Sequence, residues 1–86
     1  MSRVLIAEDE PRIASFIEKG LRANGFATSV AADGGAARAQ AASGEFDLLV
    51  LDIGLPVMDG FEVLRRLRAE RNPIPVIILL YLFNVL

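Results

Sequence analysis

The sequence predicts an α/β fold in which a parallel sheet is built from strands that alternate with helices along the chain. Short apolar runs alternate with segments whose apolar residues recur at helical spacing. The helical segments are about ten residues long, which suits the crossover connections between parallel strands. Hydrophobic residues make up 53% of the 86 residues and charged residues 23%, a globular composition that allows one domain at most.

The first part of the chain predicts a strand, a helix and a second strand. Residues 4–7 form an apolar run typical of a buried strand. Pro11 suits the first turn of the helix that follows, because its missing N–H has no partner there, and Gly25 is a natural stop. Residues 26–31 alternate and predict a second, weaker strand. The apolar residues at helical spacing in between are Ile13, Phe16, Ile17 and Leu21.

The middle of the chain predicts a turn, a second helix and a third strand. Residues 33–35 read Asp-Gly-Gly and predict the turn. Residues 36–43 are rich in alanine and predict a helix that Gly44 closes. Residues 48–51 are continuously apolar and end in Asp52, as expected for a parallel strand covered on both faces.

The last elements are a third helix and a fourth strand. Residues 53–58 predict a loop, after which Asp59 can cap a helix. Asn72 and Pro73 end that helix, and residues 76–80 predict the strand. The helix shows a spacing of three and four residues at Phe61, Leu64, Leu67 and Arg68.

Composition restricts the chemistry that the chain can carry. It has no cysteine and no histidine, which excludes thiolate and imidazole chemistry and leaves carboxylates, backbone carbonyls and cations such as Mg²⁺. With 9 Lys+Arg against 11 Asp+Glu, the net charge of −2 gives no footprint for nucleic acid. We interpret the arginines that follow Asp59 as the solvated face of a helix. They are Arg65, Arg66, Arg68 and Arg71.

Neither end of the chain predicts a membrane segment. The apolar run at residues 4–7 is too short for a signal peptide. The run from Ile74 to Leu86 is interrupted by Pro75 and is shorter than the ~20 apolar residues that a span needs. We therefore expect a cytoplasmic protein without a membrane contact.

Acidic residues follow two of the predicted strands. Glu8 and Asp9 follow the first strand, and Asp52 ends the third. Ligands of open α/β sheets bind beyond the carboxyl ends of the strands, so three carboxylates would converge if these strands are neighbours. Their mutual repulsion would be relieved by a cation, and Mg²⁺ fits a site made of oxygen ligands. A simpler interpretation stays open for the acidic triplet that ends in Glu10, which could complement the positive end of a helix.

Two segments resemble a known family. Residues 4–11 read VLIAEDEP and resemble the start of a response-regulator receiver domain. Residues 48–60 read LLVLDIGLPVMDG and resemble its phosphoacceptor segment. The resemblance extends from Val4 to about Leu79, and the residues of the two segments are similar to those of the branch with winged-helix output domains.

The resemblance implies both a fold and a set of roles. The fold would be a flavodoxin-like doubly wound parallel sheet of strand order 2-1-3-4 that lacks the last helix–strand–helix, with residues 1–80 as a partial receiver domain and 81–86 as an apolar tail. Asp52 would be the phosphoacceptor. Glu8 and Asp9, with Asp52 and the backbone carbonyl of Gly54, would hold Mg²⁺. The phosphodonor would be a phosphohistidine on a sensor histidine kinase.

The chain departs from the family pattern near residue 80. Leu80 stands where the family has a Thr or Ser that hydrogen-bonds the phosphoryl group. The only lysine, Lys19, falls in the first predicted helix and does not replace the family's Lys after the fifth strand. An early stop, a frame shift and a natural short form all remain open. Because the hydroxyl and the ammonium that bind the phosphoryl group in the family are both missing, we expect weaker phosphoryl transfer.

Three functions follow from these observations. The first is a phosphoacceptor module of two-component signalling that is not an enzyme, makes no direct contact with nucleic acid and self-associates through its fourth strand and tail. The alternative is a non-signalling interaction or dimerisation module on a degenerate receiver fold. A Mg²⁺-dependent hydrolase is a third, disfavoured because no second catalytic group or phosphate-binding glycine loop is visible.

Overall fold

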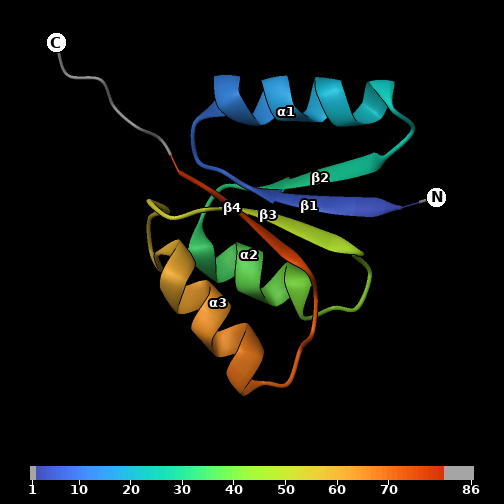
Figure 1. Ribbon diagram of the computed structural model, residues 1–86. Coiled ribbons are helices and arrows are strands. Elements are labelled where there is room, and N and C mark those ends of the chain that lie inside the picture. The colour runs from blue at the N-terminus through green and yellow to red at the C-terminus, as the bar shows by residue number, and fades with distance from the viewer. Residues whose placement is uncertain (1, 81–86) are drawn as a thin grey trace, which may run out of the picture.

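The computed structural model describes residues 2–80 and contains seven elements in strict alternation (Figure 1). The apolar tail predicted at residues 81–86 lies outside the described residues. Among residues 2–80, no helix has the length and apolarity needed to cross a membrane. The elements are β1 (Arg3–Ala7), α1 (Pro11–Ala23), β2 (Ala27–Ala31), α2 (Gly34–Ala41), β3 (Leu48–Asp52), α3 (Gly60–Ala69) and β4 (Val76–Leu79).

The four strands form one parallel sheet in the order β2-β1-β3-β4, which confirms the predicted strand order. Helix α1 covers one face of the sheet, and α2 and α3 lie together on the other (Figure 1). This doubly wound arrangement confirms the predicted α/β fold class. Because β1 and β3 are neighbours at the centre, their carboxyl ends meet at one edge of the sheet.

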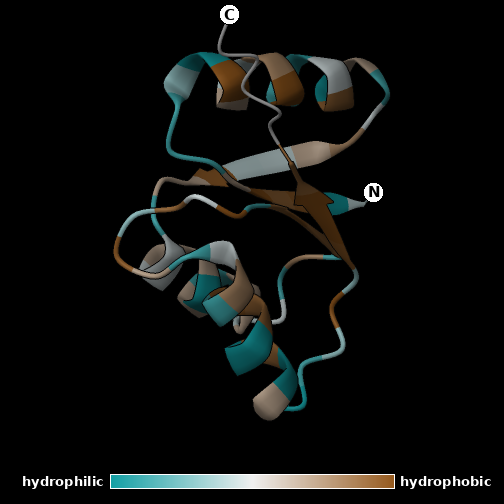
Figure 2. Cartoon of the chain, turned by 60° about the vertical axis from the view of Figure 1, so that its left-hand side comes forward, coloured by the Kyte–Doolittle hydropathy of each residue, from teal (hydrophilic) through white to brown (hydrophobic). Residues whose placement is uncertain are grey.

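The core lies on both faces of β1. Successive side chains of a strand point to opposite faces, so Val4 and Ile6 pack toward α1 while Leu5 and Ala7 pack toward α2 and α3. All four are fully buried, as the continuous apolar run predicts for a strand covered on both faces. Figure 2 shows the hydrophobic colour concentrated in the strands at the centre. The strand that carries Glu8 at its end is therefore held rigidly.

Helix α2 begins earlier than the sequence predicts. The turn expected at residues 33–35 is wrong, because Gly34 and Gly35 are already helical. Asp33 is the cap: its Oδ1 accepts a hydrogen bond of 2.8 Å from the Ala36 amide, which satisfies one of the free donors of the first turn. The helix also ends at Ala41, two residues before the predicted end.

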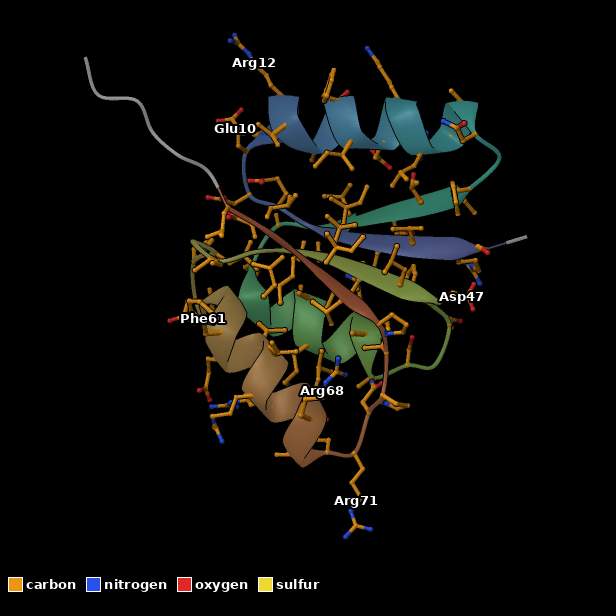
Figure 3. All side chains as sticks on the ribbon, viewed as in Figure 1. Glu10, Arg12, Asp47, Phe61, Arg68 and Arg71 are labelled. Atoms are coloured by element: carbon orange, nitrogen blue, oxygen red, sulfur yellow. The ribbon has the colours of Figure 1, made fainter. Side chains whose placement is uncertain are left out.

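Two aromatic residues that the helical spacing includes are exposed. Phe16 on α1 and Phe61 on α3 point into solvent, and Figure 3 shows Phe61 at the outer side of its helix. Consecutive helical residues project about 100° apart, so Ile17 faces the sheet and its neighbour Phe16 does not. The spacing located both helices correctly but made their buried faces too wide.

Strand β4 is an edge of the described sheet, and it is one residue shorter than predicted because Leu80 lies outside it. Ile77 pairs with Val50, which faces α1, so Ile77 lies on the same side of the sheet. Helix α1 packs mainly over β1 and β2, and the described residues leave the Ile77 side chain only partly covered. Ile77 is consequently 52% exposed.

Candidate functional site

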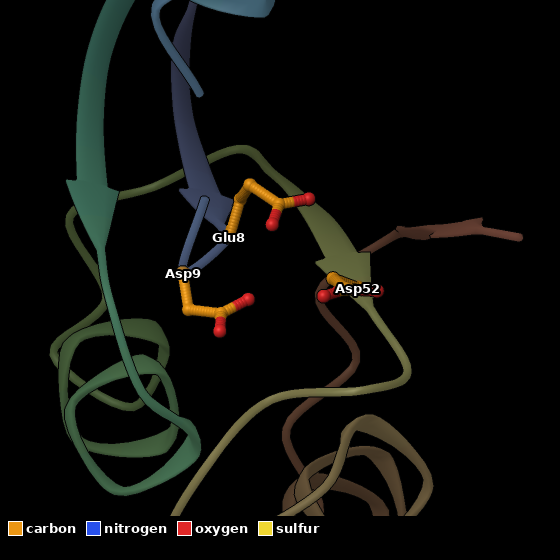
Figure 4. Close-up of side chains that lie close together, drawn as sticks. All are labelled: Glu8, Asp9 and Asp52. Atoms are coloured by element: carbon orange, nitrogen blue, oxygen red, sulfur yellow. The ribbon is translucent and has the colours of Figure 1, made fainter. Parts of the chain in front are cut away.

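Three carboxylates converge at the carboxyl edge of the sheet (Figure 4). Glu8 and Asp9 follow β1, and Asp52 is the last residue of β3. The two strands are paired in parallel with Ala7 opposite Leu51, which brings their ends side by side. One oxygen from each carboxylate lies within 4.8 Å of the others. The structure thus brings together the three acidic residues singled out from the sequence.

The carboxylates differ in exposure and are oriented by backbone amides. Glu8 is 2% exposed and Asp52 is 6% exposed, whereas Asp9 is exposed. The Glu10 amide donates a 3.0 Å hydrogen bond to Glu8 Oε2, and the Gly54 amide donates a 3.2 Å hydrogen bond to Asp52 Oδ1. Both amides belong to the segments that directly follow the strands, so the chain fixes the acidic groups locally.

Glu10 has a separate role from the cluster. Its Oε1 accepts a 3.1 Å hydrogen bond from the Arg12 amide and caps the start of α1. Figure 3 shows Glu10 and Arg12 at that end of the helix. The simpler interpretation of the acidic triplet, as a complement to the helix end, therefore describes Glu10, while the Glu8 and Asp9 carboxylates converge with Asp52.

The carboxylates line a pocket of about 610 Å³. Its wall on the side of β4 is apolar, and none of its described lining residues is basic. Closely spaced oxygen ligands without nitrogen or sulfur ligands fit a hard divalent cation such as Mg²⁺, which would offset their negative charge. The residues that line the pocket are Glu8, Asp9, Glu10, Ile13, Asp52, Ile53, Gly54, Leu79 and Leu80.

The loop that follows Asp52 is held at the start of α3. The Gly60 amide donates a 2.8 Å hydrogen bond to the Ile53 carbonyl, and a Cβ at Gly60 would overlap the Asp52 carbonyl oxygen. Glycine is therefore required for this approach of helix to strand end. Asp59 caps α3 through a 2.9 Å hydrogen bond from the Glu62 amide, which confirms the predicted cap.

The same loop is also held by α2. The Gly34 amide donates a 3.0 Å hydrogen bond to the Pro56 carbonyl, and a Cβ at Gly34 would stand 2.6 Å from the Met58 carbonyl carbon. Sequence reasoning missed this contact and assigned Gly34 to a turn. The Asp-Gly-Gly sequence gives no signal for it, because the partner lies on a distant segment of the chain.

The arginines that follow Asp59 lie away from the pocket, on the exposed side of α3 and just beyond it, as Figure 3 shows for Arg68 and Arg71. Hydrogen bonds from Arg65 and then from Arg66 lower the pKa of Glu62 from 4.5 to about 2. Arg65 and Arg66 form ion pairs with Glu62 on the exposed surface of α3, in agreement with the predicted solvated face.

Comparison with known sequences identifies one protein family over most of the chain. Residues 4–80 match the family of response regulator receiver domains. The transcriptional regulatory protein PrrA of Mycobacterium tuberculosis is 42% identical over 77 residues, which cover 90% of this chain and 33% of that protein. The chain thus spans about a third of the length of this curated relative.

Solved structures agree with this match. The receiver domain of the Francisella response regulator 1452 superimposes with a TM-score of 0.90 at 36% identity, covering 99% of this chain and 70% of that one. The receiver domain of the sensor histidine kinase PA1611 of Pseudomonas aeruginosa, with a magnesium ion coordinated in its active-site cleft, gives a TM-score of 0.87 at 34% identity and covers 92% of this chain and 66% of its own. On fold, strand order and sequence, the chain belongs to the family of response regulator receiver domains.

Proposed function

We propose that this chain accepts a phosphoryl group on Asp52 as a module of two-component signal transduction. The observation that carries the proposal is the convergence of Glu8, Asp9 and Asp52 within 4.8 Å at the ends of two adjacent parallel strands. Membership of the receiver family supports the same role.

Asp52 is the nucleophile in this proposal. An ionised carboxylate has no proton to lose, so the attack needs no general base, and the pocket indeed offers no histidine. The bond that forms joins an Asp52 carboxylate oxygen to phosphorus. The bond that breaks joins phosphorus to the donor, at the imidazole nitrogen of a phosphohistidine or at the carboxyl oxygen of acetyl phosphate. The amide of Gly54 holds the carboxylate for this attack.

Glu8, Asp9 and Asp52 are the proposed side-chain ligands of Mg²⁺, together with the backbone carbonyl of Gly54. When bound, the cation would offset the negative charge of the phosphoryl oxygens. The amide of Glu10 keeps Glu8 turned toward the cluster. The solved receiver domain of PA1611 supports this assignment, because its own cleft coordinates magnesium.

The proposed phosphodonor is a sensor histidine kinase, and the proposed outcome is control of transcription. Both come from the family and from relatives that are named transcriptional regulatory proteins. The chain covers only a third of those relatives, so the output activity would belong to a longer protein or to a partner.

Labelling with acetyl phosphate and Mg²⁺ tests the proposal directly. Intact-protein mass spectrometry should show one added phosphoryl group, and Asp52→Asn should abolish it. Asp59→Asn is the matched control, because Asp59 lies outside the cluster and Asn caps a helix as well as Asp does. Asp9→Asn should weaken both labelling and Mg²⁺ binding measured by calorimetry. Labelling that persists in Asp52→Asn would refute the acceptor.

A second function is favoured by the exposed edge of the sheet. Strand β4 carries no charged side chain, Ile77 within it is 52% exposed, and Leu80 just beyond it is 76% exposed. Unpaired apolar edges favour pairing with another chain. The second proposal is self-association of two copies through β4, with the tail at 81–86 included as predicted.

Sedimentation over a range of concentrations tests this second proposal. The unmodified protein should shift from monomer to dimer as its concentration rises, and Ile77→Lys should stay monomeric because it places a charge on the edge. Val30→Lys is the matched control, since Val30 is also an exposed strand residue but lies on β2. A monomer at every concentration would contradict self-association.

A further inference from the structure

The loop between β3 and α3 runs beside the pocket and is held from two sides. It comprises residues 53–59, begins directly after Asp52 and contains Gly54, whose amide bonds Asp52. Gly60 holds its far end against the Ile53 carbonyl. Gly34 holds its middle through the Pro56 carbonyl, at 3.0 Å. Two helices that are separate in sequence therefore fix one short loop.

The contact at Gly34 leaves no room for a side chain. A Cβ on Gly34 would overlap the carbonyl oxygen of Met58 and stand 2.6 Å from its carbonyl carbon and 2.8 Å from its Cβ. The nearest atoms are mostly backbone, so a rotamer change in Met58 cannot relieve the overlap. An alanine at this position would have to push the loop away from α2 or break the hydrogen bond to Pro56.

The neighbouring Gly35, in contrast to Gly34, has room for a side chain. A Cβ on Gly35 would meet Asp33 Oδ1 at 3.3 Å and Val57 Cγ1 at 3.6 Å, and both atoms belong to side chains that can shift slightly. The requirement for glycine at the start of α2 is thus specific to position 34. Helix capping does not explain it, because Asp33 supplies the cap for the same turn.

We propose that Gly34 is a positioning residue for the phosphoacceptor site: by admitting the Met58 carbonyl, it seats the loop on α2 and so sets Gly54 beside Asp52. The displacement forced by a side chain would be transmitted through Leu55, the single residue that separates Gly54 from Pro56. Gly54 would then change its distance to Asp52 and to any cation held there. This inference rests on the proposed phosphoacceptor function and deepens it.

The test compares Gly34→Ala with two controls on the same turn. Gly35→Ala adds the same methyl group one residue away. Asp33→Ala removes the cap of α2 and destabilises the helix without adding an atom near the loop. Gly34→Ala should slow labelling of Asp52 by acetyl phosphate at least tenfold, because displacements of about 1 Å near a reacting group cost up to 100-fold. Both controls should label at the unmodified rate once unfolded protein is corrected for.

Amide chemical shifts of the metal-free, unphosphorylated proteins separate this inference from the phosphoacceptor proposal. Gly34→Ala should shift the amide resonances of Gly54 and Met58, and Asp33→Ala should leave them in place. If the unmodified protein takes no label, the acceptor proposal fails while the shifts still decide whether Gly34 seats the loop. Unchanged Gly54 shifts in Gly34→Ala would overturn the inference, as would equal loss of labelling in Gly34→Ala and Asp33→Ala.

The unmodified protein supplies a further measurement should Gly34→Ala not fold. If α2 and α3 hold the loop as one body, the amides of Gly34 and Gly60 exchange with solvent only when the loop opens. Their hydrogen-exchange protection should then agree within about threefold. A Gly34 amide that exchanges at the unprotected rate while Gly60 stays protected would overturn the inference.

Discussion

Val57 lies at the centre of the loop beside the acceptor carboxylate, and replacing it with glycine should stabilise the protein. Its φ of 71° lies in the left-handed region, which a β-branched residue rarely adopts. The Met58 amide donates a 2.8 Å hydrogen bond to the Pro56 carbonyl across Val57, which makes this a γ-turn with a positive central φ, a rare and strained form. Glycine adopts the same conformation without a steric cost.

The size of the effect follows from three opposing contributions. A left-handed conformation costs an L-residue ~1–2 kcal/mol, and β-branching places Val57 toward the upper value. Glycine makes the unfolded chain more flexible, which cancels ~0.4–1 kcal/mol of the stabilisation gained by relieving the strain. The Val57 side chain is 85% exposed, so the burial that is lost amounts to only about 0.2 kcal/mol. The net expectation is a stabilisation of about 1 kcal/mol, or a rise in Tm of about 4–8 °C.

Urea denaturation followed by circular dichroism measures this free energy. Val57→Ala is the matched control, because alanine keeps a Cβ in the left-handed conformation and should recover only part of the gain. Arg71→Gly is a second control at the other non-glycine residue with a positive φ among the described residues, at 61°, and should stabilise less because arginine is not β-branched. A Val57→Gly protein less stable than the unmodified one would refute the strain argument.

Three further outcomes are expected. Glu62→Gln should lower Tm by a constant amount above about pH 5, and the difference should vanish near pH 2: the lowered pKa of Glu62, from 4.5 to about 2, gives stability that is present above 4.5 and lost as the pH falls through 2. Leu80→Thr should raise the labelled fraction of Asp52 about tenfold, because a hydroxyl at the pocket rim can donate to the phosphoryl group; mass spectrometry over time measures it. Asn72→Ala should lower the free energy of unfolding by about 2 kcal/mol in urea denaturation, because it leaves the Ala41 carbonyl, 3.0 Å away, without this donor.

The sequence predicted the elements best where their residues carry a local signal. Strands β1 and β3 were placed to within one residue, because each is an apolar run bounded by charged residues. The start of α2 was misplaced because Gly34 and Gly35 have the local preference of a turn. A tertiary contact overrides that preference: Gly34 is helical and lies against a loop that is distant in the sequence.

The acidic cluster could be predicted because it depends on topology. Parallel strands end at the same edge of a sheet, so residues that follow adjacent strands must meet there. The groups that orient the carboxylates could not be predicted in this way. The donors are the backbone amides of Glu10 and Gly54. Every residue except proline carries such a donor, so residue type does not single these two out, and only the local backbone path turns them toward Glu8 and Asp52.

The site thus combines a rigid part with a part that is held under strain. Glu8 directly follows one buried strand and Asp52 ends another, whereas the loop after Asp52 contains an unfavourable conformation at Val57. Such strain persists only where surrounding contacts fix the chain, and here Gly34 and Gly60 fix the loop from two helices. If those contacts set the geometry, Val57→Gly should raise stability and leave the labelling rate of Asp52 unchanged. Gly34→Ala should instead change the labelling rate by more than its loss of stability explains, so the two variants separate the stability of the loop from its position.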